Sequence, residues 1–315
     1  HNAVLRLKPF IAHCELPVID DTHILSHDQI EAVLMRRAGY DVRVVPEEEL
    51  GWEENPPTLI EFIRRDLRWC QGNMQYWRFL LLPGLKLVSR YQLAIAILMF
   101  VGSPAWIGML VLGTLSVALA ETPGDFMRAD AGIAIFVLVL VMWFAPKTLS
   151  AIDLLLRPQA RRAFGGSARF LVNFVVEMVF SILLCPIMWF GHTIFLTGLL
   201  FGREIGWIGQ TRDDHAVPLV LALRNLWPHS LLGCGAIGLL ALTHPAAIPY
   251  ALFLAAGPAL AIPLAVVTAW PSLGVTFARI GIGRLPEETA PPPELCALAL
   301  PAIETAAPVP RPQPI

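Results

Sequence analysis

A series of long apolar runs, beginning near Tyr91, limits what this chain can fold into. A helix needs about 20 apolar residues to cross the bilayer core, with about 17 as a lower bound. We expect membrane spans at 91–113, 131–148, 169–185, 187–201, 230–245 and 249–270. The composition agrees, because 56% of the 315 residues are hydrophobic and 15% are charged, whereas a soluble domain carries about 25% charged residues. The sequence therefore predicts an α-helical polytopic membrane protein with six transmembrane helices.

The charges between these runs predict an orientation. Lys86 and Arg90 precede the first run, the connection 121–130 is acidic, and basic residues return between 147 and 169. Because Lys and Arg mark cytoplasmic loops, both ends of the chain should be cytoplasmic if 169–201 forms a hairpin broken near Pro186. A single overlong helix over 169–201 is the alternative.

The same runs divide the chain into three parts. Residues 1–90 are mixed and polar and read as α/β, with "YDVRVV" as a short strand. A transmembrane region covers 91–272 and includes a cytoplasmic loop at 202–229. The tail 273–315 is rich in Pro and Ala and is expected to be disordered.

Net charge and cysteine spacing exclude two classes of protein. The formal net charge of −2 excludes a strongly basic nucleic-acid binder. The five cysteines form no C-x-x-C pair, so neither a zinc site nor a disulfide framework is indicated. The chain starts at His1 rather than Met, and we expect it to be part of a longer protein.

One predicted helix combines cations and aromatic residues just before the first membrane run. Thr58 with Glu61 is spaced as a capping box, and the helix that follows carries its apolar residues on one face and Arg64, Arg65 and Arg68 on the other. The arginines could meet lipid headgroups at the membrane surface. They could instead bind an anion, with Trp69 offering a flat face to a sugar or base. Spacing leaves both possibilities open.

A second candidate is Asp28. Ser26 with Gln29 is spaced as a capping box, which places Asp28 in the first turn of a helix that Gly39 should end. The helix dipole favours an ionised carboxylate there, and such a group can accept a hydroxyl proton. An ordinary helix-start residue is the commoner explanation of an Asp at this position.

Several motifs in order carry a resemblance to a known family. "HNAVLRLKPF", "ILSHD" and "RRDLRWCQGN", followed by membrane runs, resemble the second half of a processive family 2 glycosyltransferase. "DLRWCQGNMQYW" and "GSPAWIG" fit as well, and the resemblance covers residues 1 to about 285. It implies that residues 1–90 are the C-terminal part of a cytoplasmic, α/β GT-A-type domain with interfacial helices.

The resemblance implies roles for individual residues. Asp28 stands where the family has the general base, although the triplet here is Ser26-His27-Asp28 rather than T-E-D. Arg65, Arg68 and Trp69 match the Q/R-x-x-R-W motif, which lies near the nucleotide diphosphate and the acceptor sugar. "GWIGQTRDD" resembles a cytoplasmic gating loop, with the candidates Trp207, Gln210 and Arg212.

The implied activity is inverting transfer of glucose from UDP-glucose to a growing β-glucan of the osmoregulated periplasmic kind, with passage across the bacterial inner membrane. The divalent metal of the family, Mg²⁺ or Mn²⁺, should have its ligands outside this chain, which alone should be inactive. Expected partners are UDP-glucose, the β-glucan acceptor, membrane lipid and a periplasmic glucan-processing protein, but no nucleic acid. A cellulose, chitin or hyaluronan synthase, or a transporter without chemistry, is the alternative.

Overall fold

The fold is known from a computed structural model, which describes residues 3–18, 23–45, 51–121, 129–206 and 213–299. This part of the chain is mainly helical and contains no strand. The strand predicted at 40–45 is wrong, because Val42 and Val44 are exposed and no described strand pairs with them. A strand is stable only when a neighbour receives its backbone hydrogen bonds.

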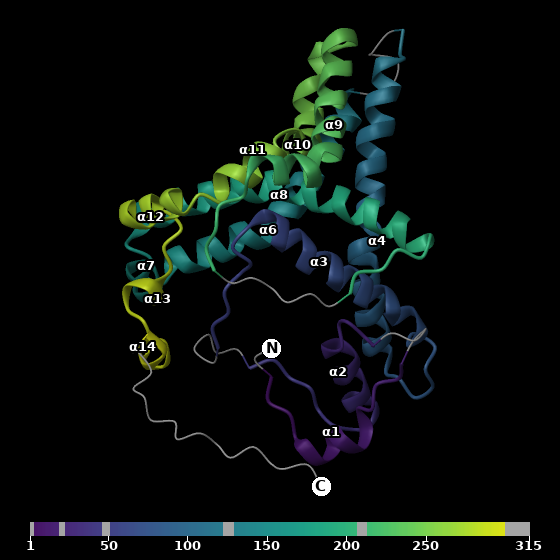
Figure 1. Cartoon of the computed structure of the whole chain (residues 1–315), viewed down its shortest axis with the longest axis vertical. Coiled ribbons are helices and arrows are strands. Elements are labelled where there is room, and N and C mark those ends of the chain that lie inside the picture. The colour runs from purple at the N-terminus through teal and green to yellow at the C-terminus, as the bar shows by residue number, and fades with distance from the viewer. Residues whose placement is uncertain (1–2, 19–22, 46–50, 122–128, 207–212, 300–315) are drawn as a thin grey trace. The chain divides into compact units, whose positions relative to one another are not determined.

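Three helices build the N-terminal part (Figure 1): α1 (Leu7–His13), α2 (Asp28–Arg37) and α3 (Leu59–Met74), which continues into the 3-10 helix η2 (Gln75–Arg78). Gly39, with a φ of 91°, follows the end of α2 and confirms the predicted stop. The Thr58 hydroxyl accepts a hydrogen bond from the Glu61 N–H at 3.3 Å and confirms the predicted cap of α3. Ile30 and Tyr76, both fully buried, belong to the core under these helices.

Four helices in the described part are long and apolar enough to cross a membrane: α4 (Leu87–Ala118), α6 (Ala129–Leu156), α8 (Ser167–Leu200) and α9 (Leu219–Thr243). After the short 3-10 helix η3 (Pro245–Ala247), α10 (Ile248–Ala259) and α11 (Ala261–Thr268) form a bent pair. The pair is bent by 52° and adds a fifth span if both halves count together. The chain is therefore a polytopic helical membrane protein, as predicted.

The hairpin predicted over 169–201 is wrong, since α8 runs through Pro186 as one helix. Membrane helices tolerate proline where neighbours pack against the freed backbone, and Pro186 is fully buried. The 34 residues of α8 extend about 51 Å at about 1.5 Å per residue. The described chain therefore has four or five candidate spans rather than six. The cytoplasmic position of both ends, which needed the hairpin, stays a prediction.

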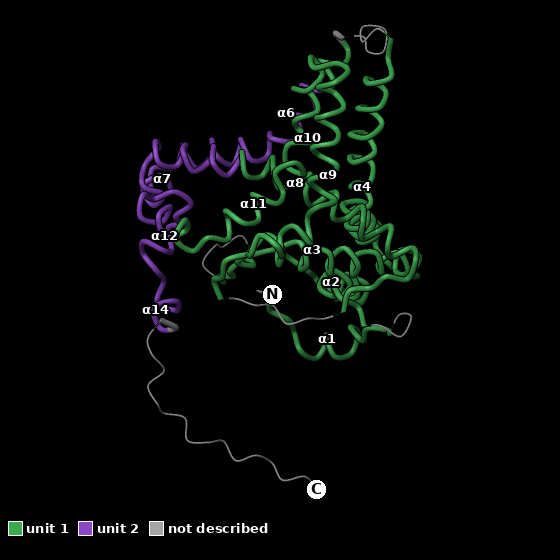
Figure 2. The backbone as a smooth tube through the Cα atoms, turned by 45° about the horizontal axis from the view of Figure 1, so that its top comes forward, with its two compact units in different colours: residues 1–135, 179–274 green, residues 136–178, 275–315 purple. Residues whose placement is uncertain are grey.

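The chain forms two compact units (Figure 2), which divide it differently from the predicted boundaries at 90 and 272. Unit 1 comprises residues 1–135 and 179–274, and unit 2 comprises residues 136–178 and 275–315. Within unit 1, α9 begins at Leu219, so the second part of the predicted loop 202–229 is helical.

Unit 2 contains most of α6, the first part of α8 and several short helices: α7 (Pro158–Ala163), the end of α12 (Pro271–Ile280), α13 (Pro286–Thr289) and α14 (Pro293–Ala299). The last two lie in the tail that was expected to be disordered, so its described part is partly helical. Glu177, a charge inside an apolar run, pairs with Lys147 at 2.6 Å. This partner explains how a carboxylate is tolerated there.

Small residues set the spacing of the helices in unit 1, where α4, α9 and α10 lie side by side (Figure 1). A Cβ added to Gly233 of α9 would meet the α10 backbone at Ala255 and Ala259. A Cβ added to Gly257 of α10 would meet the carbonyl oxygen of Leu183 in α8. Close approach at small residues is a main source of helix association in lipid.

We predict that Gly233→Ala and Gly257→Ala each lower the melting temperature of the purified protein, because the added methyl group meets backbone atoms. Overpacking of this kind costs about 1–3 kcal/mol. Gly235→Ala in α9 is the matched control, since nothing lies within 4 Å of its added Cβ, and it should be neutral or slightly stabilising. Thermal unfolding measures the difference, and equal melting temperatures for all three variants would contradict the packing.

Candidate functional site

The segment that carries Asp28 is attached to the end of α3. The Leu25 N–H donates to the Gln75 side-chain oxygen at 3.1 Å, and the Tyr76 hydroxyl donates to the Ser26 carbonyl oxygen at 2.7 Å. A Cβ added to Gly72 would lie 2.6 Å from the Ser26 nitrogen and Cβ. The loop before α2 therefore contacts the backbone of α3 directly.

Tyr76 also affects the N-terminal cap of α2. The N-cap residue is His27 and makes no side-chain capping bond, while the Ser26 Oγ lies 3.0 Å from the Tyr76 hydroxyl. The predicted capping box of Ser26 and Gln29 is therefore wrong, because the phenol engages the serine instead. Burial raises the pKa of Tyr76 above its usual value, so the phenol remains a hydrogen-bond donor to still higher pH. Asp28 is nevertheless the first residue of α2, so its predicted first-turn position is confirmed.

Asp28 is accessible. Its side chain is 53% exposed and lies 3.8 Å from the His27 Nδ1, and this nitrogen is 2.9 Å from the Glu31 Oε1. The three side chains form the one group of metal-ligand type found in the described residues. They do not fit Mg²⁺ or Mn²⁺, because these ions favour oxygen ligands and the available histidine nitrogen already contacts Glu31. An exposed carboxylate in this position can instead accept a proton from a bound hydroxyl.

Arg65 lies over aromatic rings of its own helix. Its guanidinium carbon is 4.8 Å from the Trp69 ring centroid and 5.2 Å from the Phe62 centroid. Its Nε is buried and has no hydrogen-bond partner among the described residues. Burial lowers the pKa of Arg65, whereas the charges of Glu53 and Asp66 raise it and that of Arg68 lowers it. Another nitrogen of the guanidinium donates to the Asn55 Oδ1 at 3.0 Å.

The spacing along α3 brings the motif to the Asp28 segment. Arg68 precedes Gly72 by four residues and Trp69 precedes it by three, so both adjoin the face that Gly72 presents. Because Gly72 lies against Ser26, the backbone positions of Arg68 and Trp69 are about one helical turn from the residue that meets the Asp28 segment. Residues 40 positions apart in the sequence thus lie in one region of unit 1.

Sequence reasoning missed a polar chain that joins α3 to two membrane helices. The Asp66 carboxylate bonds to the Nε2 of His192 in α8, and the His192 Nδ1 lies 2.9 Å from the Oγ of Ser103 in α4. Ser103 is 1% exposed, so it cannot attack a substrate, and the chain positions α3 instead. A histidine within an apolar run was the available signal, because such a residue needs a polar partner.

A further bond attaches the segment after α8 to α3, since the Ile205 N–H donates to the Gln71 Oε1 at 2.7 Å. Gln71 is buried at this contact. The gating-loop candidates Trp207, Gln210 and Arg212 lie outside the described residues and begin two positions after Ile205.

We predict that Gly72→Ala displaces the Asp28 segment, because the new Cβ meets the Ser26 backbone. Hydrogen exchange over residues 24–31 should become about tenfold faster, which corresponds to about 1.4 kcal/mol of lost local stability. The control is Gly102→Ala in α4, where nothing lies within 4 Å of the added Cβ. Unchanged exchange over 24–31 in the Gly72 variant would show that the contact does not exist in solution.

Comparisons with known proteins agree with the motifs. Residues 1–151 match the family model described as "Glycosyl transferase family group 2". The chain is 33% identical over 316 residues to "Glucans biosynthesis glucosyltransferase H" of Pseudomonas entomophila, covering 94% of the chain and 37% of that relative. It is 34% identical over 321 residues to a Xylella fastidiosa protein of the same name, covering 95% of the chain and 50% of that relative. The chain thus spans half or less of the length of these relatives. No solved structure matches it.

Proposed function

We propose that the chain, whose residues 1–151 match the model of glycosyl transferase family group 2, is the membrane-embedded C-terminal part of a glucosyltransferase that builds a glucan. The observation that carries this proposal is the attachment of the Asp28 segment to α3 through Gly72, Gln75 and Tyr76. In a glycosyltransferase, the general base and the diphosphate-binding motif must both lie at the atoms that react. The attachment of the Asp28 segment to α3 meets part of this requirement. The names of the relatives support the class of product.

The proposed reaction is an inverting transfer of glucose from UDP-glucose to a growing β-glucan. Asp28 accepts the proton of the acceptor hydroxyl while that oxygen attacks the anomeric carbon. The bond from that carbon to the UDP oxygen breaks, and the charge that develops on UDP meets Arg65 and Arg68. Trp69, which lies against Arg65, supplies a flat apolar face for the acceptor sugar.

A divalent metal ion, Mg²⁺ or Mn²⁺, would neutralise the diphosphate in this family. The His27, Asp28 and Glu31 group does not fit it, and Asp28 has to remain available as the base. We therefore assign the metal ligands and the uridine pocket to parts of the protein outside this chain. On this proposal, the chain alone does not transfer glucose.

We propose that the protein lies in the bacterial inner membrane with α3 on the cytoplasmic side. Lys86 and Arg90 flank the start of α4, close to α3 in sequence. At the other end of α4, the Ala120 carbonyl accepts from the His244 Nε2 at 3.1 Å, so the ends of α4 and α9 lie together. Residues 243–247 contain no Lys or Arg. By the positive-inside rule, this charge distribution supports a cytoplasmic position for α3.

The bond between Ile205 and α3 supports the proposed gating role of Trp207, Gln210 and Arg212, a role that requires α8 to begin and end on the cytoplasmic side. Glucan made beside Trp69 would enter a path between the membrane helices of unit 1. Delivery to a glucan-processing partner on the periplasmic side is part of this proposal.

We predict that Asp28→Asn in the full-length protein abolishes polymer synthesis while UDP-glucose binding is retained. Loss of a general base lowers the rate by about 10²–10⁴-fold. Asp153→Asn is the control, since Asp153 is an exposed acid that pairs with Arg157 in unit 2. Radiolabelled glucose incorporation measures the rate, and near-normal turnover in Asp28→Asn would exclude Asp28 as the base.

Linkage analysis of the product separates a glucan of this class from cellulose, chitin or hyaluronan.

Variants of the motif separate a substrate role from a membrane-surface role. Trp69→Ala should weaken acceptor engagement by about 1–3 kcal/mol, by analogy with stacking of bases on aromatic side chains, and Trp69→Phe should recover part of the loss. Arg68→Lys keeps the charge but loses the planar fork, so donor turnover and inhibition by UDP should change. If the helix only anchors the membrane surface, both variants will keep wild-type donor and acceptor kinetics.

A further inference from the structure

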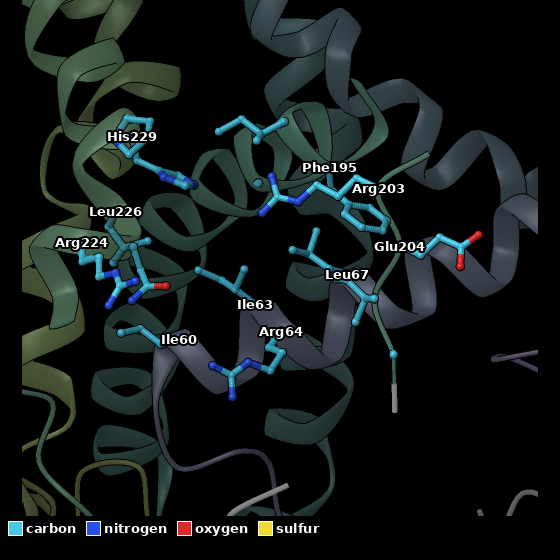
Figure 3. Close-up of a pocket in the computed structure, with 16 residues that line it drawn as sticks. Ile60, Ile63, Arg64, Leu67, Phe195, Arg203, Glu204, Arg224, Leu226 and His229 are labelled. Carbon is cyan, nitrogen blue, oxygen red and sulfur yellow. The ribbon is translucent and has the colours of Figure 1, made fainter. Parts of the chain in front are cut away.

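A cavity of about 530 Å³ lies in unit 1 between α3, α8, the segment 203–206 and α9 (Figure 3). It contains none of the residues proposed for catalysis or for substrate binding. Its lining combines arginines with an aliphatic wall, and this combination indicates the class of ligand that fits.

The charge at the cavity is positive. Arg64, Arg203 and Arg224 come from α3, from the segment after α8 and from α9, and none forms an ion pair with another described residue. Figure 3 shows the Glu204 carboxylate directed away from Arg203 and Arg224. Arginine forks bind phosphate oxygens in pairs, so the cavity is complementary to a phosphate group.

His229 provides an independent sign of a ligand. The residue is 4% exposed and lines the cavity, and its ring packs edge-on against Phe190 at 5.0 Å. Neither ring nitrogen has a hydrogen-bond partner of normal geometry among the described residues, although the Ile187 backbone lies close enough to interact with the ring. A buried polar group without a full partner is costly, and a ligand oxygen in the cavity would satisfy it.

Most of the rest of the wall is apolar, formed by Ile60, Ile63, Leu67, Ile194 and Leu226. The polar Asn225 also lines the cavity, and its side-chain amide already donates to the Leu221 carbonyl oxygen at 2.8 Å. A sugar chain needs partners for its hydroxyl groups, which aliphatic side chains do not offer. A hydrocarbon chain needs such a wall, and basic pockets between membrane helices bind anionic lipid headgroups. We propose that this cavity binds one anionic phospholipid, with its phosphate between Arg203 and Arg224 near His229 and an acyl chain along the aliphatic wall.

Native mass spectrometry of the delipidated full-length protein tests the proposal, with phosphatidylglycerol and phosphatidylcholine as probes. The wild-type protein should retain one phosphatidylglycerol in preference to phosphatidylcholine. Arg203→Gln with Arg224→Gln should weaken this binding by about tenfold or more, since two charge-assisted contacts are lost. Arg162→Gln with Arg279→Gln is the matched control, because both arginines are exposed and neither lines the cavity; it should bind as the wild type does.

Two further measurements decide between the possible outcomes. His229→Phe keeps the aromatic packing against Phe190, so it should weaken phosphatidylglycerol binding without lowering the melting temperature. If the double arginine variant does not fold, lipid binding by His229→Phe alone tests the proposal. The proposal is overturned if His229→Phe binds phosphatidylglycerol as the wild type does. Displacement of the lipid by UDP or inorganic phosphate would also overturn it and assign the site to a soluble phosphate. Glucose transfer measured in the same samples distinguishes a failure of this site from a failure of the proposed catalytic function.

Discussion

The polar chain of Asp66, His192 and Ser103 is the interaction on which the rest of unit 1 depends. It crosses from α3 to α8 and then to α4, in surroundings where an unpaired carboxylate or imidazole is costly. Apolar packing against membrane helices allows many rotations of an amphipathic helix. A single buried polar chain selects one of them, and so it decides which face of α3 carries Arg65, Arg68 and Trp69. The Gln71 bond to Ile205 supports the same placement from the other side.

Local sequence signals predicted the features that depend on neighbours in the chain. The apolar runs located the membrane helices, Thr58 located the start of α3, and Gly39 located the end of α2. The failures all depended on distant residues. Ser26 does not cap α2 because Tyr76, 50 positions later, takes its hydroxyl. The strand at 40–45 lacks a partner, and α8 continues through Pro186 because neighbouring helices bury it.

The candidate site also combines features that local sequence predicted with features that depend on distant residues. Asp28 and the arginine motif could be proposed from their residues, but the attachment of the Asp28 segment to α3 follows from Gly72, Gln75 and Tyr76, which no periodicity singles out. The cavity beside them could not be predicted at all. Its arginines come from α3, from the segment after α8 and from α9. Contacts between such distant parts of the chain cannot be predicted from local sequence patterns. His229 was the one local indication, as a histidine within an apolar helix.

The contact between Gly72 and Ser26 joins two backbones without an intervening side chain. No long side chain lies between the helix and the loop, so direct van der Waals packing sets the separation between them. Neither element can shift by the length of a monosaccharide while the contact lasts. On the proposed function, the growing glucan would then be the moving part, translocating by one sugar unit past a stationary centre after each addition.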